Sequence, residues 1–158
     1  MKTLVAYFSA TGTTEYPANI IAELLKSDIF EIVPAELYTA DDLNWNNQKS
    51  RSSVEMKEGI RPALDHNPIS IAEYDLIFLG FPIWWGREPS VVDTFLDAYD
   101  FTGKNVIPFC TSGGSGIGKT CERIASIVGE GACVDKGKRF GGEVSAEDLK
   151  YWNETLGL

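Results

Sequence analysis

The residues best suited to chemistry lie between an apolar run at 3–8 and an apolar helical pattern at 17–25. They are Ser9, Ala10, Thr11, Gly12, Thr13 and Thr14. A helix N-terminus offers unpaired N–H groups and about half a positive charge, the hydroxyls add donors, and Gly12 permits close approach. Because no Lys or Arg is present, this segment predicts a single terminal phosphate rather than a triphosphate with its metal ion. The alternative is a β–α turn with a capping Thr and no ligand.

Two adjacent tryptophans follow a second apolar run, at 74–81. Their segment consists of Pro82, Ile83, Trp84, Trp85 and Gly86. An aromatic side chain at a strand end can stack on a flat ring, or it can close the end of the core. Because neighbouring side chains of an extended chain point in opposite directions, we expect one Trp to stack and the other to pack.

A third segment of small residues follows the apolar run at 105–110. It consists of Thr111, Ser112, Gly113, Gly114, Ser115 and Gly116. Such residues bring backbone N–H groups close to a ring edge, although loops without a ligand can have the same composition. All three segments follow strands, and ligands of parallel sheets bind at the carboxyl ends of the strands. Together they predict a ligand with a phosphate at one end and a flat heteroaromatic ring at the other.

The segment 113–120 also satisfies the pattern G-x-x-x-x-G-K-[ST] of a nucleoside-triphosphate loop. It follows a strand and opens a helix, and residues 132–135 could supply a metal-binding strand end. We disfavour an NTPase or kinase because that interpretation leaves residues 9–14 and the two tryptophans unexplained. Fewer than forty residues follow Lys119, too few for the rest of such a domain, and we expect Lys119 to face solvent.

Apolar strand-like runs alternate with helical patterns along the chain. The expected strands are 2–8, 29–33, 74–81, 105–110 and one that begins at 131–134. The expected helices are 17–26, one around 50–60, 89–99, 117–128 and 146–156, the last capped by Ser145. This alternation predicts an α/β fold with a parallel sheet, right-handed crossovers and helices on both faces. The basic cluster at 136–139 indicates a solvated turn.

The polar segment 34–72 is the least legible part of the chain. A connection of this length is often functional or mobile. Trp45 either covers a ligand or anchors the loop, and we favour the anchor. His66 is the only histidine and lies in a turn-like Asp-His-Asn-Pro sequence, so we expect a surface residue rather than a ligand or general base.

The composition indicates an ordinary globular protein. Its 158 residues fit one domain spanning 1–158, which needs neither disulfides nor metal to fold. The net charge of −9 argues against nucleic acid or an anionic membrane as a partner; it favours a basic protein surface, or serves solubility alone. Cys110, Cys121 and Cys133 lack CxxC spacing and are expected to be reduced and mostly buried. With no membrane-length apolar run and no signal-peptide pattern, we expect a cytoplasmic protein without membrane insertion.

The segment 9–14 matches every fixed position of the [ST]-x-T-G-x-T phosphate loop of the flavodoxin family. Residues 78–86 and 108–116 resemble the short-chain flavodoxin-like branch, and the resemblance covers essentially the whole chain. It implies a three-layer αβα sandwich with a five-stranded parallel sheet of order 2-1-3-4-5 and non-covalent FMN. By this resemblance 9–14 would hold the phosphate, 82–86 would line the isoalloxazine with Trp84 or Trp85 on its face, and 111–116 would line the pyrimidine side.

Some features depart from the family pattern. Pro17 lies one turn into the first helix and Thr13 stands where the family often has Asn, but neither should prevent phosphate binding. The third segment lacks an aromatic residue, whereas many flavodoxins hold the flavin between two. The outer flavin face is therefore expected to be open to hydride donors or quinones unless Trp45 or Tyr38 covers it.

Three functions follow from these patterns. The favoured one is an FMN electron carrier that docks on a redox partner protein through its acidic surface. The alternative is an FMN-dependent NAD(P)H:quinone-type reductase with a small quinone-like acceptor, in which Arg51, Arg61 and Arg87 are candidates for a nicotinamide phosphate. The third, remote one is a P-loop nucleotide-binding enzyme. No Ser-His-Asp, Cys-His or metal-ligand constellation is visible, so no catalytic side chain is assigned.

Overall fold

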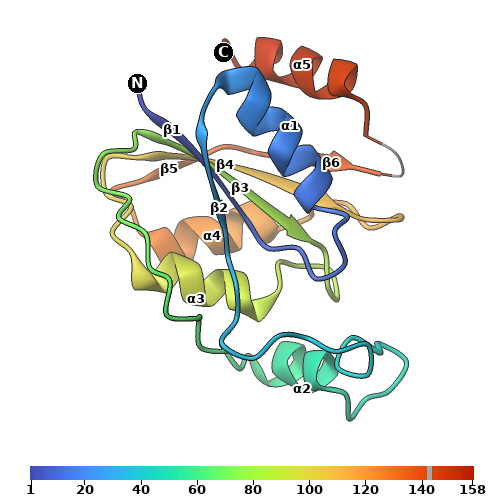
Figure 1. The fold of residues 1–158 in the computed structure, drawn as a ribbon. Coiled ribbons are helices and arrows are strands. Elements are labelled where there is room, and N and C mark those ends of the chain that lie inside the picture. Colours follow the sequence, from blue (N-terminus) through green and yellow to red (C-terminus); the bar gives the residue numbers. More distant parts are fainter. Residues whose placement is uncertain (142–143) are drawn as a thin grey trace.

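The protein, described by a computed structural model over residues 1–141 and 144–158, is built around a parallel sheet with helices on both faces (Figure 1). The strands run in the order β2-β1-β3-β4-β5, and β6 pairs with β4 beyond the end of β5. This confirms the predicted order 2-1-3-4-5. The strands are β1 (Thr3–Tyr7), β2 (Asp28–Glu31), β3 (Leu76–Pro82), β4 (Asn105–Thr111), β5 (Cys133–Val134) and β6 (Lys138–Phe140).

The helices form one layer on each face of the sheet (Figure 1). One layer contains α1 (Glu15–Leu25) and α5 (Ala146–Thr155), and the other contains α3 (Ser90–Ala98) and α4 (Thr120–Val128). A fifth helix, α2 (Arg51–Glu58), lies beyond α3. Two hydrophobic clusters result, one between the sheet and each layer. The near-continuous apolar character of β1, β3 and β4 therefore reflects burial on both faces.

The fifth strand is interrupted, and the reason is a proline in its neighbour. The carbonyls of Lys104 and Val106 accept hydrogen bonds from the N–H groups of Cys133 and Asp135. In a parallel ladder alternate residues face the same neighbouring strand, so position 108 also faces this side. Pro108 has no N–H to donate. The partner strand therefore breaks into β5 and β6, and the prediction of a solvated turn at 136–139 is wrong for Lys138 and Arg139.

The helix boundaries agree with the sequence expectation except at α4. The predicted helix at 117–128 begins only at Thr120, because Gly118 has a φ of +56° that an α-helix does not allow. Pro17 lies in the first turn of α1, where a missing N–H costs no helical hydrogen bond. Ser145 caps α5 through a capping box with Asp148, as predicted.

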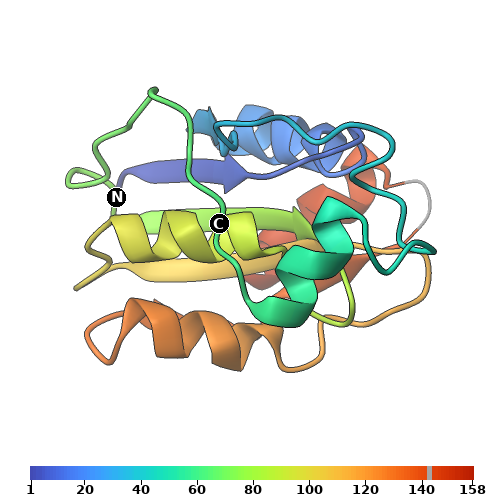
Figure 2. The same cartoon turned by 90° about the horizontal axis from the view of Figure 1, so that it is seen from below.

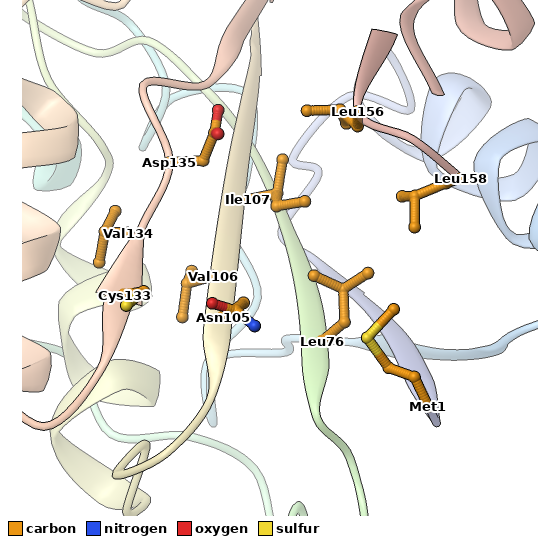
Figure 3. A pocket seen from close by; sticks show the side chains of 10 residues that line it. All are labelled: Met1, Leu76, Asn105, Val106, Ile107, Cys133, Val134, Asp135, Leu156 and Leu158. Atoms are coloured by element: carbon orange, nitrogen blue, oxygen red, sulfur yellow. The ribbon is translucent and has the colours of Figure 1, made fainter. Parts of the chain in front are cut away.

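The three predicted ligand segments meet at the carboxyl edge of the sheet, toward which the strand arrows of Figure 2 point. A separate cavity of about 370 Å³ lies at the opposite, amino edge, between the starts of β3, β4 and β5 (Figure 3). Met1 and Leu158, from the two termini, also line it. This cavity is remote from all three segments. Within the described residues, no helix is long and apolar enough to cross a membrane.

Gly80 provides a test of how β3 and β4 pack. A Cβ at this position would lie 2.2 Å from the Phe109 ring, which is fully buried. We expect Gly80→Ala to lower the free energy of unfolding by about 1–3 kcal/mol, the usual cost of overpacking. Urea unfolding without added ligand measures this change. Gly114→Ala, where a Cβ meets nothing within 4 Å, is the control, and equal stability of the two variants would contradict the prediction.

Candidate functional site

Ser9 shapes the first segment by accepting hydrogen bonds from the backbone of its own loop. Its Oγ accepts from the N–H of Gly12 at 3.0 Å and from that of Thr14 at 3.2 Å. Gly12 has a φ of +90°, which favours glycine, and a Cβ there would meet no atom within 4 Å. The loop is therefore wound around the Ser9 hydroxyl, with Gly12 bordering open space.

The donors left for a ligand lie at the tip of this loop and the start of α1. Thr11 and Thr13 are exposed, and their hydroxyl oxygens are 3.2 Å apart. Within the described part of the chain, the N–H groups of Thr11, Thr13 and Glu15 donate to no protein acceptor. These groups lie at the start of α1, the positive end of its dipole. Their arrangement suits an anion bound by neutral donors, as the sequence predicts.

Thr14 and Thr111 join the first segment to the third. Thr14 is buried, and its Oγ1 lies 2.8 Å from that of Thr111. The Thr111 carbonyl in turn accepts from the N–H of Ile83 at 3.2 Å. All three segments thus meet at Thr111. The Thr14 hydroxyl makes this buried contact, and its predicted role in holding a phosphate stays a prediction.

The second segment ends in a tight turn at 84–87. The N–H of Trp84 donates to the Arg87 carbonyl at 2.9 Å, and that of Arg87 returns to the Trp84 carbonyl at 3.2 Å. Both central residues have positive φ, +49° at Trp85 and +78° at Gly86, as in a type I′ turn. A left-handed conformation costs a bulky residue roughly 1–2 kcal/mol. The turn therefore holds Trp85 at a conformational cost.

The two indoles occupy different surroundings. Trp84 is half-buried and meets the rings of Phe8 and Tyr38 edge-on, at centroid distances of 5.6 and 5.3 Å. Trp85 keeps 51% of its surface exposed. The two tryptophans therefore differ in burial, and which of them stacks on a ring stays a prediction. Because Phe8 directly precedes the first segment, the Trp84 ring lies beside the 9–14 loop.

Arg139 of β6 holds the third segment. Its Nε donates to the Ser112 hydroxyl at 2.9 Å, and its Nη2 donates to the Ser112 carbonyl at 3.1 Å. The Ser112 hydroxyl also contacts the Ser115 carbonyl, and the Ser112 N–H donates to Phe140. The sequence analysis missed Arg139. Pro108, which interrupts the fifth strand, was the available signal that residues after 135 return to the sheet.

The 34–50 segment is fixed by Tyr38 rather than by Trp45. Trp45 is 72% exposed, so the expectation that it anchors the loop is wrong. The Tyr38 hydroxyl instead donates a hydrogen bond to the Glu55 carboxylate. The Arg51 guanidinium lies 4.0 Å from the Tyr38 ring centroid, as in a cation–π contact. His66 is exposed, as expected.

Each arginine considered for a nicotinamide phosphate pairs with an acidic residue. Arg51 Nε lies 2.9 Å from Glu55, Arg61 lies 3.7 Å from Asp97, and Arg87 lies 3.1 Å from Asp93. Arg51 and Arg87 are therefore held by buried carboxylates, whereas the Arg61–Asp97 pair is exposed to solvent. The cysteines are free thiols; Cys110 is buried as expected, whereas Cys133 is exposed.

A buried ionic cluster lies directly behind the turn. Glu88 and Asp93 carry side chains at most 3% exposed, and Arg87 and Arg123 pair with both carboxylates at 2.9–3.5 Å. Within the described residues, Glu88 Oε2 and Asp93 Oδ1 have no hydrogen-bond partner. Burial, together with the neighbouring Glu88, raises the pKa of Asp93 to about 7. The two arginines oppose this shift but do not cancel it.

The position of Thr120 argues against interpreting 113–120 as a nucleoside-triphosphate loop. Thr120 is fully buried at the start of α4, so its hydroxyl cannot reach a metal ion in the loop. Lys119 is exposed, as expected. The described residues contain no group of His, Cys, Asp and Glu side chains suited to a metal.

Comparison with known proteins shows to which family the chain is similar. The sequence model described as flavodoxin matches residues 2–156. Two solved structures are of proteins provisionally named flavoproteins, from Bacteroides uniformis and Bacteroides eggerthii. Their sequences are 47% and 38% identical to this chain, and their structures align with TM-scores of 0.91 and 0.90. The alignments cover 97% of both chains for the first, and 99% of this chain and 98% of the other for the second.

A more distant structure shares the fold. A Lactobacillus acidophilus flavoprotein in complex with FMN is 22% identical, has a TM-score of 0.70 and aligns over 96% of this chain and 98% of its own. No curated protein matches the chain.

The Asp93 cluster predicts a pH dependence of stability. Because its folded-state pKa lies well above the ordinary 3.8, folding takes up a proton between about pH 4 and pH 7. The free energy of unfolding should thus be largest at the acid end of this range and fall as pH rises toward 7. Asp93→Asn should remove up to about 1.4 kcal/mol per pH unit of this slope. Urea unfolding across this range measures it.

Asp97→Asn on the same helix is the matched control, because the Asp97 side chain is 72% exposed. It should leave the slope unchanged. An Asp93→Asn variant with the wild-type slope would show that the buried pair takes up no proton on folding.

Proposed function

The chain belongs to the flavodoxin family, and on that premise we propose that it is a redox flavoprotein that binds FMN non-covalently and transfers electrons through it. The observation that carries the proposal is the convergence of three segments on Thr111: an anion-binding loop, an aromatic turn and a glycine-rich loop. A mononucleotide with a flat ring has matching parts. The three segments offer a phosphate site, a stacking surface and open backbone in that order.

The proposed phosphate site is the loop tip at Thr11 to Thr13 with the first turn of α1. Neutral N–H and hydroxyl groups would bind the phosphate, because no Lys or Arg lies in the loop. Ser9 and Thr14 also hold the loop and its contact with β4, and their hydroxyls retain further hydrogen-bonding capacity for the phosphate. The open space beside Gly12 leaves room for the phosphate oxygens.

The proposed ring site lies between the 84–87 turn and the third segment. We assign the stacking face to Trp84, because Phe8 and Tyr38 hold its ring beside the phosphate loop. A preorganised ring loses little freedom on binding. Gly86, Gly113 and Gly114 also border open space, since a Cβ at any of them would meet no atom within 4 Å. Backbone at these positions can therefore approach the edge of a flat ligand.

Bound FMN would supply the electron-transfer chemistry. The chain's residues would bind the phosphate, orient the ring and set the surrounding charge. That charge is negative: Glu15 opens α1, and burial and the Glu15 carboxylate raise the pKa of nearby Glu31. Negative surroundings oppose the addition of further negative charge at the site. We expect them to lower the reduction potential of the bound cofactor.

An electron carrier fits the surface better than a nicotinamide-dependent reductase. The net charge of −9 favours docking on a basic protein partner. The three arginines considered for a nicotinamide phosphate each pair with an acidic side chain. We expect electron delivery to a basic haem protein, such as cytochrome c, to slow as ionic strength rises. Rapid NAD(P)H:quinone turnover by the isolated protein would favour the reductase instead.

The test of FMN binding compares two ligands and two variants. An absorbance spectrum of the purified protein, then titration of the FMN-free protein, should reveal one flavin site. Thr13→Val should weaken FMN about tenfold, because it removes a hydrogen bond to a charged group. It should not affect riboflavin, which lacks the phosphate. Trp84→Leu should weaken both ligands by a similar factor through lost stacking.

Trp85→Leu is the matched control for Trp84→Leu. It should weaken both ligands less, because Trp85 lies outside the proposed stacking face. A protein that ignores FMN would refute the proposed function. A larger loss from Trp85→Leu would assign the stacking face to Trp85, contrary to the proposal.

A further inference from the structure

A cavity of about 380 Å³ lies between the 45–57 segment and the 84–87 turn. Helix α2, which provides one wall, lies toward the carboxyl end of the sheet (Figure 2). The cavity is lined by Trp45, Gln48, Ser53, Met56, Lys57 and Trp85. Apart from Trp85, it contains no residue of the three segments assigned to FMN.

Two exposed indoles border this one cavity. Trp45 and Trp85 keep 72% and 51% of their surfaces exposed, although burial of a large aromatic side chain is favourable. Met56, which is buried, adds a polarisable side chain to the wall. Concave sites with aromatic walls and a few polar groups are typical of small-molecule binding.

Both indoles are held by a structured backbone. The 39–53 loop is fixed by reciprocal hydrogen bonds between Thr39 and Asp42, at 3.0 and 3.1 Å, and by Ser53 donating to the Asn47 carbonyl at 2.8 Å. Trp85 is fixed in its left-handed conformation by the turn. The aromatic walls therefore belong to ordered loops rather than to a frayed segment.

The polar residues that line the cavity favour an anion. Lys57 is exposed and, within the described residues, forms no ion pair. The Glu55 carboxylate on the same helix is already paired with Arg51 at 2.9 Å. Gln48 adds an amide that can donate or accept. In a chain of net charge −9, an unpaired ammonium beside two indoles is a specific feature.

We propose that this cavity binds a planar aromatic compound that carries an acidic group. The ring lies against Trp45 and Trp85, and the acidic group meets Lys57. The site adjoins the proposed FMN site through Trp85 of the 82–86 segment, but no residue of 9–14 or 111–116 lines it. It goes beyond the proposed function and adds a second ligand next to the same turn.

The probe is anthraquinone sulfonate, titrated by calorimetry into the protein carrying its FMN. We expect one binding site. Trp45→Leu should weaken the probe about tenfold, because a stacking surface is lost. Lys57→Gln should weaken it about two- to fivefold, as expected for an exposed charge pair. A neutral hydroxymethyl-anthraquinone should be insensitive to Lys57→Gln, and Trp45→Leu should leave FMN affinity unchanged.

Tyr151→Leu and Lys150→Gln on α5 are the matched controls, since both residues are exposed and remote from the cavity. They should bind the probe like the wild type. Unchanged affinity in both Trp45→Leu and Lys57→Gln, or displacement of FMN by the probe, would overturn the proposal. If the protein holds no FMN, the same titration of the FMN-free protein tests the cavity alone. A failed flavin site and a failed second site are thereby distinguished.

Discussion

The contact between the Thr14 and Thr111 hydroxyls is the constraint on which the site depends. It joins the start of α1 to the end of β4, and the Thr111 carbonyl then holds Ile83 at the end of β3. Parallel pairing brings these strand ends to one edge but does not lock the loops that follow. The buried hydroxyl contact supplies that lock, so three segments far apart in the chain can act on one ligand.

Ionic contacts support the loops from outside this junction. Arg139 holds Ser112 from β6, while the Arg87, Glu88, Asp93 and Arg123 cluster lies beneath the aromatic turn. Buried ion pairs stabilise little after desolvation, but losing one partner is costly because a buried charge remains. Such a cluster favours a single arrangement of the turn. Asp93, which shares this buried site with Glu88, makes that arrangement sensitive to pH.

The turn has two sides with different roles. Trp84 lies beside the 9–14 loop and packs on Phe8 and Tyr38, whereas Trp85 lines the cavity beside α2. The left-handed conformation of Trp85 is the physical cause, because it reverses the chain between two adjacent side chains. One tight turn thereby connects the flavin site proposed for the family fold with the second aromatic site proposed here.

The sequence by itself determined the alternation of strands and helices, the helices on both faces and the three loops, because periodicity, turn residues and the 9–14 motif are local signals. The strand order followed from the resemblance to the flavodoxin family. Tertiary structure decided what each side chain does. Thr14 became buried, Trp45 stayed exposed, and Arg139 entered a strand because residues 138–140 pair with the end of β4. Pairing partners far apart in the chain set these outcomes, and no local pattern encodes which distant partner a hydroxyl, an indole or a guanidinium meets.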